Sequence, residues 1–172
     1  MNLSLFKETG LRWLWLSFLF LIIDQVTKQW VVATFDLYES VQVLPFFNLT
    51  YVHNLGAAFS FLSDAGGWQR WFFAAVAFLV SVALIVWLGK TRLTEQKLCI
   101  AYALILGGAL GNLIDRVLFG YVIDFIHVYY ENWHYPAFNI ADSAICVGAG
   151  LLIWDAFTNN NENSNDELSK EK

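Results

Sequence analysis

The sequence predicts an all-α membrane protein with four transmembrane helices and a small β-rich external platform. Apolar residues make up 58 % of the 172 residues and charged residues only 15 %, against roughly 25 % charged in an average soluble domain. A soluble protein of this size needs far more polar surface to cover its core. The chain also holds four stretches with the length and apolarity of a membrane span, which needs roughly 20 residues. Lipid is therefore the expected solvent.

The four predicted spans contain no proline, a residue that would interrupt the hydrogen bonds of a helix interior. The last residues of the chain are polar and low in complexity, which is typical of a disordered segment. We expect one membrane domain over residues 1–158 and a disordered, polar cytoplasmic tail over residues 159–172. The spans are expected at about residues 11–35, 71–88, 98–119 and 137–157.

Basic residues predict the orientation. They occur before the first span, between the second and third spans, and at the C-terminus, whereas the connections at about 36–69 and 120–136 contain none. Because connections rich in Lys and Arg stay in the cytoplasm, both termini are expected there and the other two connections outside. The longer one carries VQVLPFF and NLTYV, which predict short strands, with Gly66-Gly67 as a turn.

Polar residues inside the spans are predicted to gather at one depth. With a rise of 1.5 Å per residue, they all fall in the outer part of the bilayer, while the inner halves of the spans are almost purely apolar. Ionisable groups in a membrane are costly and usually functional. These residues are Asp24 and Lys28 in the first span, Asn112, Asp115 and Arg116 in the third, and Asn139 and Asp142 in the first two turns of the fourth.

Two pairs at this depth have a structural interpretation. Asp24 and Lys28 are four residues apart and share a helix face, and Asp115 adjoins Arg116. Such ion pairs could simply hold the helices together, which is as well supported as a direct role in chemistry.

Asp124, in the short external connection, and Asp142 remain once these basic partners are assigned. Two carboxylates held close together cannot both ionise easily, so one keeps a proton near neutral pH. Such a pair can activate water and protonate a leaving amine, although two aspartates could equally bind a cation. The three histidines show no metal-ligand spacing, and both cysteines lie in apolar runs, so neither a metal nor a disulfide is assigned.

Two other classes of function remain open from these residues alone. A small cation or proton transporter could use Asp24, Asp115, Asp124 and Asp142 as a relay, but transport needs a polar path that reaches both membrane faces. A non-enzymatic scaffold would have no use for two carboxylates at one depth. No basic cluster suggests nucleic acid as a partner.

Five short motifs in one order cover nearly the whole chain apart from its tail. They are Asp24-Gln25-Val26-Thr27-Lys28, Asn54-Leu55-Gly56-Ala57-Ala58-Phe59, GGALGNLIDR at 107–116, Val122-Ile123-Asp124-Phe125 and FNIADSAI at 138–145. Any one of them is a weak signal, but all five on four spans are highly specific. In these motifs the chain resembles the lipoprotein signal peptidase family, also called signal peptidase II.

The resemblance implies an aspartic endopeptidase of the bacterial cytoplasmic (inner) membrane, with its active site near the outer face and Asp124 and Asp142 as the catalytic residues. Its substrates would be prolipoproteins cleaved just before a diacylglyceryl-modified cysteine. The resemblance implies no metal or organic cofactor, and a cyclic peptide of the globomycin type as inhibitor. A monomer surrounded by membrane lipids is expected. The implied substrate-binding residues are Asn54, Asn112, Arg116 and Asn139, and the implied supporting positions are Asp24, Lys28, Gly108, Asp115 and Ala141.

Overall fold

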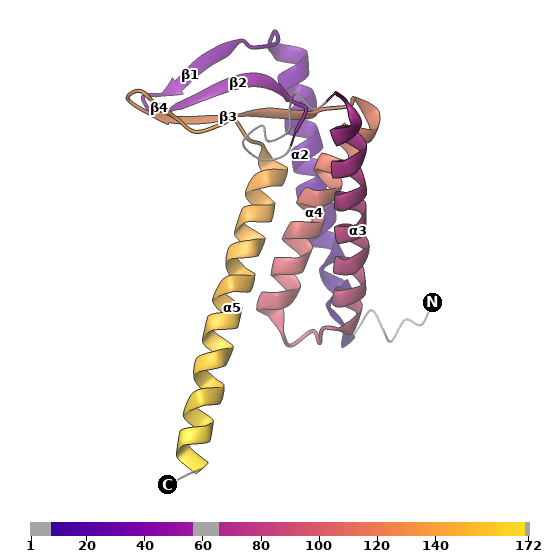
Figure 1. The fold of residues 1–172 in the computed structure, drawn as a ribbon, viewed down its shortest axis with the longest axis vertical. Coiled ribbons are helices and arrows are strands. Elements are labelled where there is room, and N and C mark those ends of the chain that lie inside the picture. Colours follow the sequence, from indigo (N-terminus) through magenta and orange to yellow (C-terminus); the bar gives the residue numbers. More distant parts are fainter. Residues whose placement is uncertain (1–7, 57–65, 171–172) are drawn as a thin grey trace.

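The computed structural model describes residues 8–56 and 66–170 and the side chains up to residue 158. Long helices stand side by side and a twisted sheet crosses one end of them (Figure 1). The described part contains four helices long and apolar enough to cross a membrane, at Gly10–Thr34, Trp68–Lys90, Gln96–Leu118 and Ile140–Thr158. The prediction of four spans with a β-rich platform is therefore confirmed.

The elements follow one another in a simple order. A 3-10 turn, η1, leads into the first long helix, and two strands separate that helix from the next. Two further strands separate the third long helix from the fourth. The helical elements are η1 (Gly10–Trp13), α2 (Leu14–Thr34), α3 (Trp68–Lys90), α4 (Gln96–Leu118) and α5 (Ile140–Lys170). The strands are β1 (Ser40–Leu44), β2 (Phe47–Asn54), β3 (Val122–Tyr130) and β4 (Trp133–His134).

Helix α4 is the central span. Of its most apolar stretch, 61 % is buried inside the protein, whereas the corresponding share is 22 % or less in the other three described spans. Small residues allow this: a Cβ atom at Gly107 would lie 2.7 Å from the Ser17 carbonyl oxygen on α2, and one at Gly108 would collide with the Ala141 carbonyl oxygen on α5. Close backbone approach through small residues is typical of helices packed in a membrane.

The sheet is antiparallel, in the order β1-β2-β3-β4. Strands β1 and β2 confirm the prediction made from VQVLPFF and NLTYV. Gly66 and Gly67 both have positive φ angles, 80° and 95°, and form the predicted turn before α3. Strand β3 was not predicted, and Asp124 lies within it rather than in an irregular connection. Its high content of β-branched and aromatic residues was an available signal.

Helix α5 differs from its predicted span at both ends. It begins at Ile140 rather than at residue 137, because Phe138 exchanges two backbone hydrogen bonds with Ile126 of β3, 2.8 and 3.0 Å long. At the other end the backbone stays helical to Lys170, beyond the span that ends at Thr158. The segment expected to be disordered contains neither glycine nor proline, so nothing in it interrupts the helix. Its role as a separate cytoplasmic tail stays a prediction.

Candidate active site

Asp124 is buried, with 2 % of its surface exposed. Strand pairing sets Val52 opposite Asp124, and Asn54, two residues further along β2, lies on the same face of the sheet. Asn54 Nδ2 donates to Asp124 Oδ2 at 2.9 Å, and Asn139 Nδ2 donates to Asp124 Oδ1 at 2.7 Å. Each carboxyl oxygen is therefore held by a side-chain amide.

Asp142 lies in the first turn of α5, where Asn139 caps the helix. The Asn139 side-chain oxygen accepts from the Asp142 N–H at 2.9 Å, and Asp142 Oδ2 accepts from the Asn139 N–H at 3.3 Å. This reciprocal arrangement is a capping box. Asn112 Nδ2 on α4 donates to Asp142 Oδ1 at 2.7 Å. Asn139 was predicted within the fourth helix; it lies instead at the capping position, because residues up to Phe138 pair with β3.

Asn139 joins the two carboxylates. It is fully buried, and its side-chain amide donates to Asp124. Its backbone N–H donates to the Asp142 carboxylate, and its side-chain oxygen accepts from the Asp142 N–H. The same amide group is 3.3 Å from Asn112 Oδ1, so that three asparagines from β2, α4 and the α5 cap surround two aspartates. The structure thus brings together Asp124, Asp142 and three of the four residues that the resemblance implied for substrate binding.

Burial, and next the negative charge of Asp142, raise the pKa of Asp124 to about 7. The hydrogen bonds from Asn54 and Asn139 oppose this shift because they stabilise the ionised form. A carboxyl group with a pKa near 7 can hold a proton or release it at neutral pH, which is what acid–base chemistry on a peptide bond requires.

Lys28 forms a second charged cluster, which lies behind the two carboxylates. Its ammonium group is fully buried and lies 2.8 Å from both Asp24 Oδ2 and Asp115 Oδ2. It also donates to Asn112 Oδ1 at 3.0 Å, and so orients the amide that binds Asp142. The predicted pair Asp24–Lys28 is confirmed. The pair Asp115–Arg116 is wrong, since adjacent residues of a helix do not face each other and Asp115 pairs with Lys28.

Arg116 faces the end of β2. Its guanidinium donates to the Gly56 carbonyl oxygen at 2.9 Å and to the Asn112 carbonyl oxygen at 3.2 Å, and lies 5.5 Å from the centre of the Phe73 ring. It also interacts electrostatically with Asp142 and Asp124. Its charge therefore acts on the site, although its hydrogen bonds hold backbone.

Gly108 and Ala141 make the contact that brings α5 to α4. The missing side chain of Gly108 leaves room for the Ala141 carbonyl, and the Ala141 N–H donates to Asp24 Oδ1 at 2.9 Å. The sequence did not single out Gln25, whose side-chain amide donates to Asp115 Oδ1 at 2.9 Å and to the Gly111 carbonyl at 3.2 Å. Its place beside Asp24 in the first motif was the available signal.

A cavity of about 270 Å³ opens beside Asp124 on the sheet. Polar side chains and a short apolar stretch line it, and two of these, His127 and His134, had been given no role from the sequence. Its lining residues are Thr50, Val52, Asn54, Asp124, His127, His134, Tyr135, Pro136 and Ala137. No three His, Cys, Asp or Glu residues of the described ranges, 8–56 and 66–170, are placed to hold a metal ion together.

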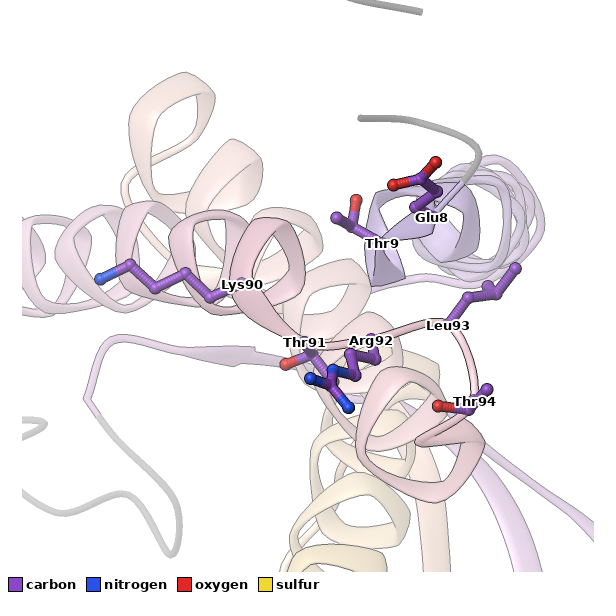
Figure 2. Close-up of a pocket in the computed structure, with 7 residues that line it drawn as sticks. All are labelled: Glu8, Thr9, Lys90, Thr91, Arg92, Leu93 and Thr94. Carbon is purple, nitrogen blue, oxygen red and sulfur yellow. The ribbon is translucent and has the colours of Figure 1, made fainter. Parts of the chain in front are cut away.

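Another cavity, of about 560 Å³, lies at the opposite end of the bundle from the sheet (Figures 1 and 2). Glu8 and Thr9 line it together with residues 90–94. Figure 2 shows the side chains of Lys90 and Leu93 pointing in opposite directions rather than toward a common centre. This cavity is remote from both carboxylates and adds nothing to their chemistry.

In the described part of the chain, four spans with a buried and a half-buried carboxylate joined at one end define a membrane-embedded aspartic peptidase. The family model described as signal peptidase (SPase) II matches residues 16–158. The chain therefore belongs to the signal peptidase II family, whose members are aspartic peptidases that cleave signal peptides. This membership gives no support to the transporter and scaffold alternatives.

Relatives and solved structures agree with this assignment. The chain is 58 % identical to a lipoprotein signal peptidase of Alteromonas mediterranea over 170 residues, and this alignment covers 99 % of this chain and 93 % of that protein. It is 62 % identical over 151 residues to one of Shewanella baltica, which covers 88 % of each. A bacterial membrane enzyme solved at 2.3 Å resolution is similar with a TM-score of 0.79 and 34 % identity, over 87 % of this chain and 89 % of that one.

Proposed function

We propose that this protein removes the signal peptide from prolipoproteins whose cysteine already carries diacylglycerol, by cleaving just before that cysteine. The observation that carries the proposal is the joining of Asp124 and Asp142 through Asn139. Membership of the signal peptidase II family and the names of its relatives, lipoprotein signal peptidases, support it.

The depth of the two aspartates fits such a substrate. Asp124 lies on β3, outside the spans, and Asp142 lies in the first turn of the fourth span. The acyl chains of a lipidated substrate are in the bilayer and its mature part is in water, so the scissile bond must lie at this boundary. The proposal therefore puts the sheet at the outer face of the bacterial cytoplasmic (inner) membrane and both termini in the cytoplasm, in accord with the basic residues.

The proposed reaction uses a water held between the two carboxyl groups, with Asp142 ionised and Asp124 protonated. Asp142 takes a proton from the water as its oxygen bonds to the peptide carbonyl carbon, and Asp124 gives its proton to the carbonyl oxygen. When the carbon–nitrogen bond breaks, the leaving nitrogen takes the proton from Asp142, and Asp124 recovers a proton from the new carboxyl group. Neither aspartate becomes acylated.

The charges around the two carboxyl groups support this division of roles. The pKa of about 7 suits Asp124 to carry the shared proton. Asp142 lies at the N-terminus of α5, where the helix dipole favours negative charge, and accepts from two donors. In this proposal Asn54, Asn112 and Asn139 hold the carboxyl groups toward the substrate, and the Arg116 charge stabilises the partial negative charge on the carbonyl oxygen until Asp124 has protonated it.

The proposal also covers the oligomeric state, the cofactors and an inhibitor. It is complete within one chain, so the proposal is for a monomer, and no step is assigned to a metal or an organic cofactor. A cyclic peptide of the globomycin type is the proposed inhibitor.

The test is cleavage of a diacylglyceryl-modified prolipoprotein by purified protein in detergent. Asp124→Asn and Asp142→Asn keep the shape of the side chain but remove the titratable group, and each is expected to lose at least about a hundredfold in activity. Asp155→Asn, in the same helix as Asp142 but at the other end of the span, is the matched control and should cleave normally.

Two results would contradict the proposal. One is near-normal cleavage by a folded Asp124→Asn or Asp142→Asn protein, which would exclude the two-aspartate mechanism. The other is equal cleavage of a prolipoprotein without the lipid, which would exclude the proposed substrate class.

A further inference from the structure

Two histidines face each other on the sheet. His127 lies on β3 and His134 on β4, two strands of one antiparallel hairpin. His134 Nδ1 lies 3.1 Å from His127 Nε2, and the rings stack with their centres 5.1 Å apart. One proton shared between these nitrogens explains the contact, because a neutral imidazole has one donor and one acceptor nitrogen.

The same geometry suits a metal ion. Two zinc–nitrogen bonds of about 2.0–2.1 Å at a tetrahedral angle separate the nitrogens by roughly 3.3 Å, close to the 3.1 Å between His127 and His134. Thr50 Oγ1 lies 3.3 Å from the other nitrogen of His127, so it can accept that proton and leave the lone pair of Nε2 for the metal. Such a second hydrogen bond normally fixes the tautomer of a ligating histidine.

The surroundings keep both rings in place and accessible. The Tyr129 ring stacks on His134 with its centre 5.5 Å away, and Ser40 Oγ lies 2.7 Å from Thr50 Oγ1. His134 is exposed and His127 half-buried. Burial, and then the nearby His134, lower the pKa of His127, which favours the neutral ring that binds metals.

We propose that His127 and His134 bind a divalent transition-metal ion such as Zn²⁺ or Cu²⁺, which replaces their shared proton and obstructs the cavity beside Asp124. Both histidines and Asp124 line that one cavity of about 270 Å³. Since no third His, Cys, Asp or Glu of the described residues completes the set, water fills the remaining positions of the ion. Such an open, two-ligand site binds reversibly, and its ion is an inhibitor rather than a resident cofactor.

The binding test does not depend on the proposed function. Cu²⁺ is titrated into purified protein without a histidine tag, and electron paramagnetic resonance counts the nitrogens bound to it. Two imidazole nitrogens are expected in the wild type, one in His127→Gln or His134→Gln, and none in the double variant. His53→Gln, also on the sheet and bonded to Tyr51 at 2.8 Å, is the matched control and should keep the two-nitrogen signal.

The second test concerns the obstruction and rests on the proposed function. Zn²⁺ should inhibit cleavage by the wild type and by His53→Gln, whereas His134→Gln should need at least about tenfold more Zn²⁺ for the same inhibition. A Cu²⁺ signal that the double variant retains would overturn the site. If the wild type shows the two-nitrogen signal and cleaves, but Zn²⁺ does not inhibit it, the proposed obstruction is wrong. If the wild type does not cleave even without added metal, the result counts against the proposed function alone.

Discussion

The two carboxylate clusters of this protein lie side by side but are neutralised differently. In the Lys28 cluster, one buried ammonium group pairs with two aspartates, Asp24 and Asp115, at 2.8 Å each. In the Asp124–Asp142 cluster, the partners are uncharged amides, and neither carboxylate makes an ion pair within the described residues. A charge matched by a cation stays fixed, whereas a carboxyl held by amides can exchange a proton. The first arrangement suits a structural role, and the second suits the catalytic role that we propose for Asp124 and Asp142.

The largest expected effect is a loss of folding stability when the Lys28 cluster is changed. Lys28→Met keeps the length of the side chain but leaves two buried carboxylates without a cation, which costs about 3–5 kcal/mol of folding free energy. Thermal unfolding in detergent measures the loss. The double variant Asp24→Asn/Lys28→Met, with one carboxylate fewer, should recover part of it; no recovery would mean that the ion pairs do not set the stability of this cluster.

A smaller effect is expected at the contact that joins the two clusters. Gly108→Ala introduces a Cβ atom against the Ala141 carbonyl, next to the N–H that binds Asp24. Overpacking of this kind costs about 1–3 kcal/mol, and the shift of α5 should also carry Asp142 away from Asn112 and lower the cleavage rate. Gly150→Ala, whose added Cβ meets no atom within 4 Å apart from its own turns of helix, is the control within a membrane-spanning helix. Equal stability of the two variants would contradict the close contact.

The smallest expected effect is the pH dependence of the cleavage rate, which involves the Asp124–Asp142 cluster alone. Since the pKa of Asp124 is raised to about 7, the protonated form that the proposed mechanism needs is lost above that pH. The cleavage rate should then fall about tenfold per pH unit above pH 7. The rate profile of wild type between pH 5 and 9 checks this, with Asp155→Asn as the control. A rate that is flat through pH 9 would contradict a shared proton on Asp124.

The titration of Asp124 should also change the folding stability, which is expected to fall as the pH rises. A carboxyl whose pKa is higher in the folded than in the unfolded chain stabilises the fold most below about pH 4, and this contribution fades as pH rises toward 7. In Asp124→Asn the contribution is absent, so its unfolding temperature should depend less on pH over that range than that of the wild type.

The spans and the depth of the polar residues could be predicted because both are local. Apolar length identifies each helix, and the helical rise places Asp24 and Asp142 along it. The helical rise also places Asn112 and Asn139 at the depth of Asp142. The resemblance added Asn54, and it implied that all three asparagines bind substrate.

Contacts between distant elements could not be predicted in this way. The second partner of Lys28 is on α4, 87 residues further on, and the register of β3 against β2 brings Asn54 to Asp124. The pairing of Phe138 with Ile126 moves the start of α5. The contact of His127 with His134 arises from a hairpin that ordinary metal-ligand spacings do not describe.

The position of Asn139 has a consequence for how the protein is made. This one residue both caps α5 and holds Asp124, so the joined pair of aspartates depends on the start of that helix. A nascent chain whose last helix has not yet entered the membrane has no paired aspartates. In the proposed mechanism, hydrolytic activity therefore requires that α5 has formed and has brought Asn139 to Asp124.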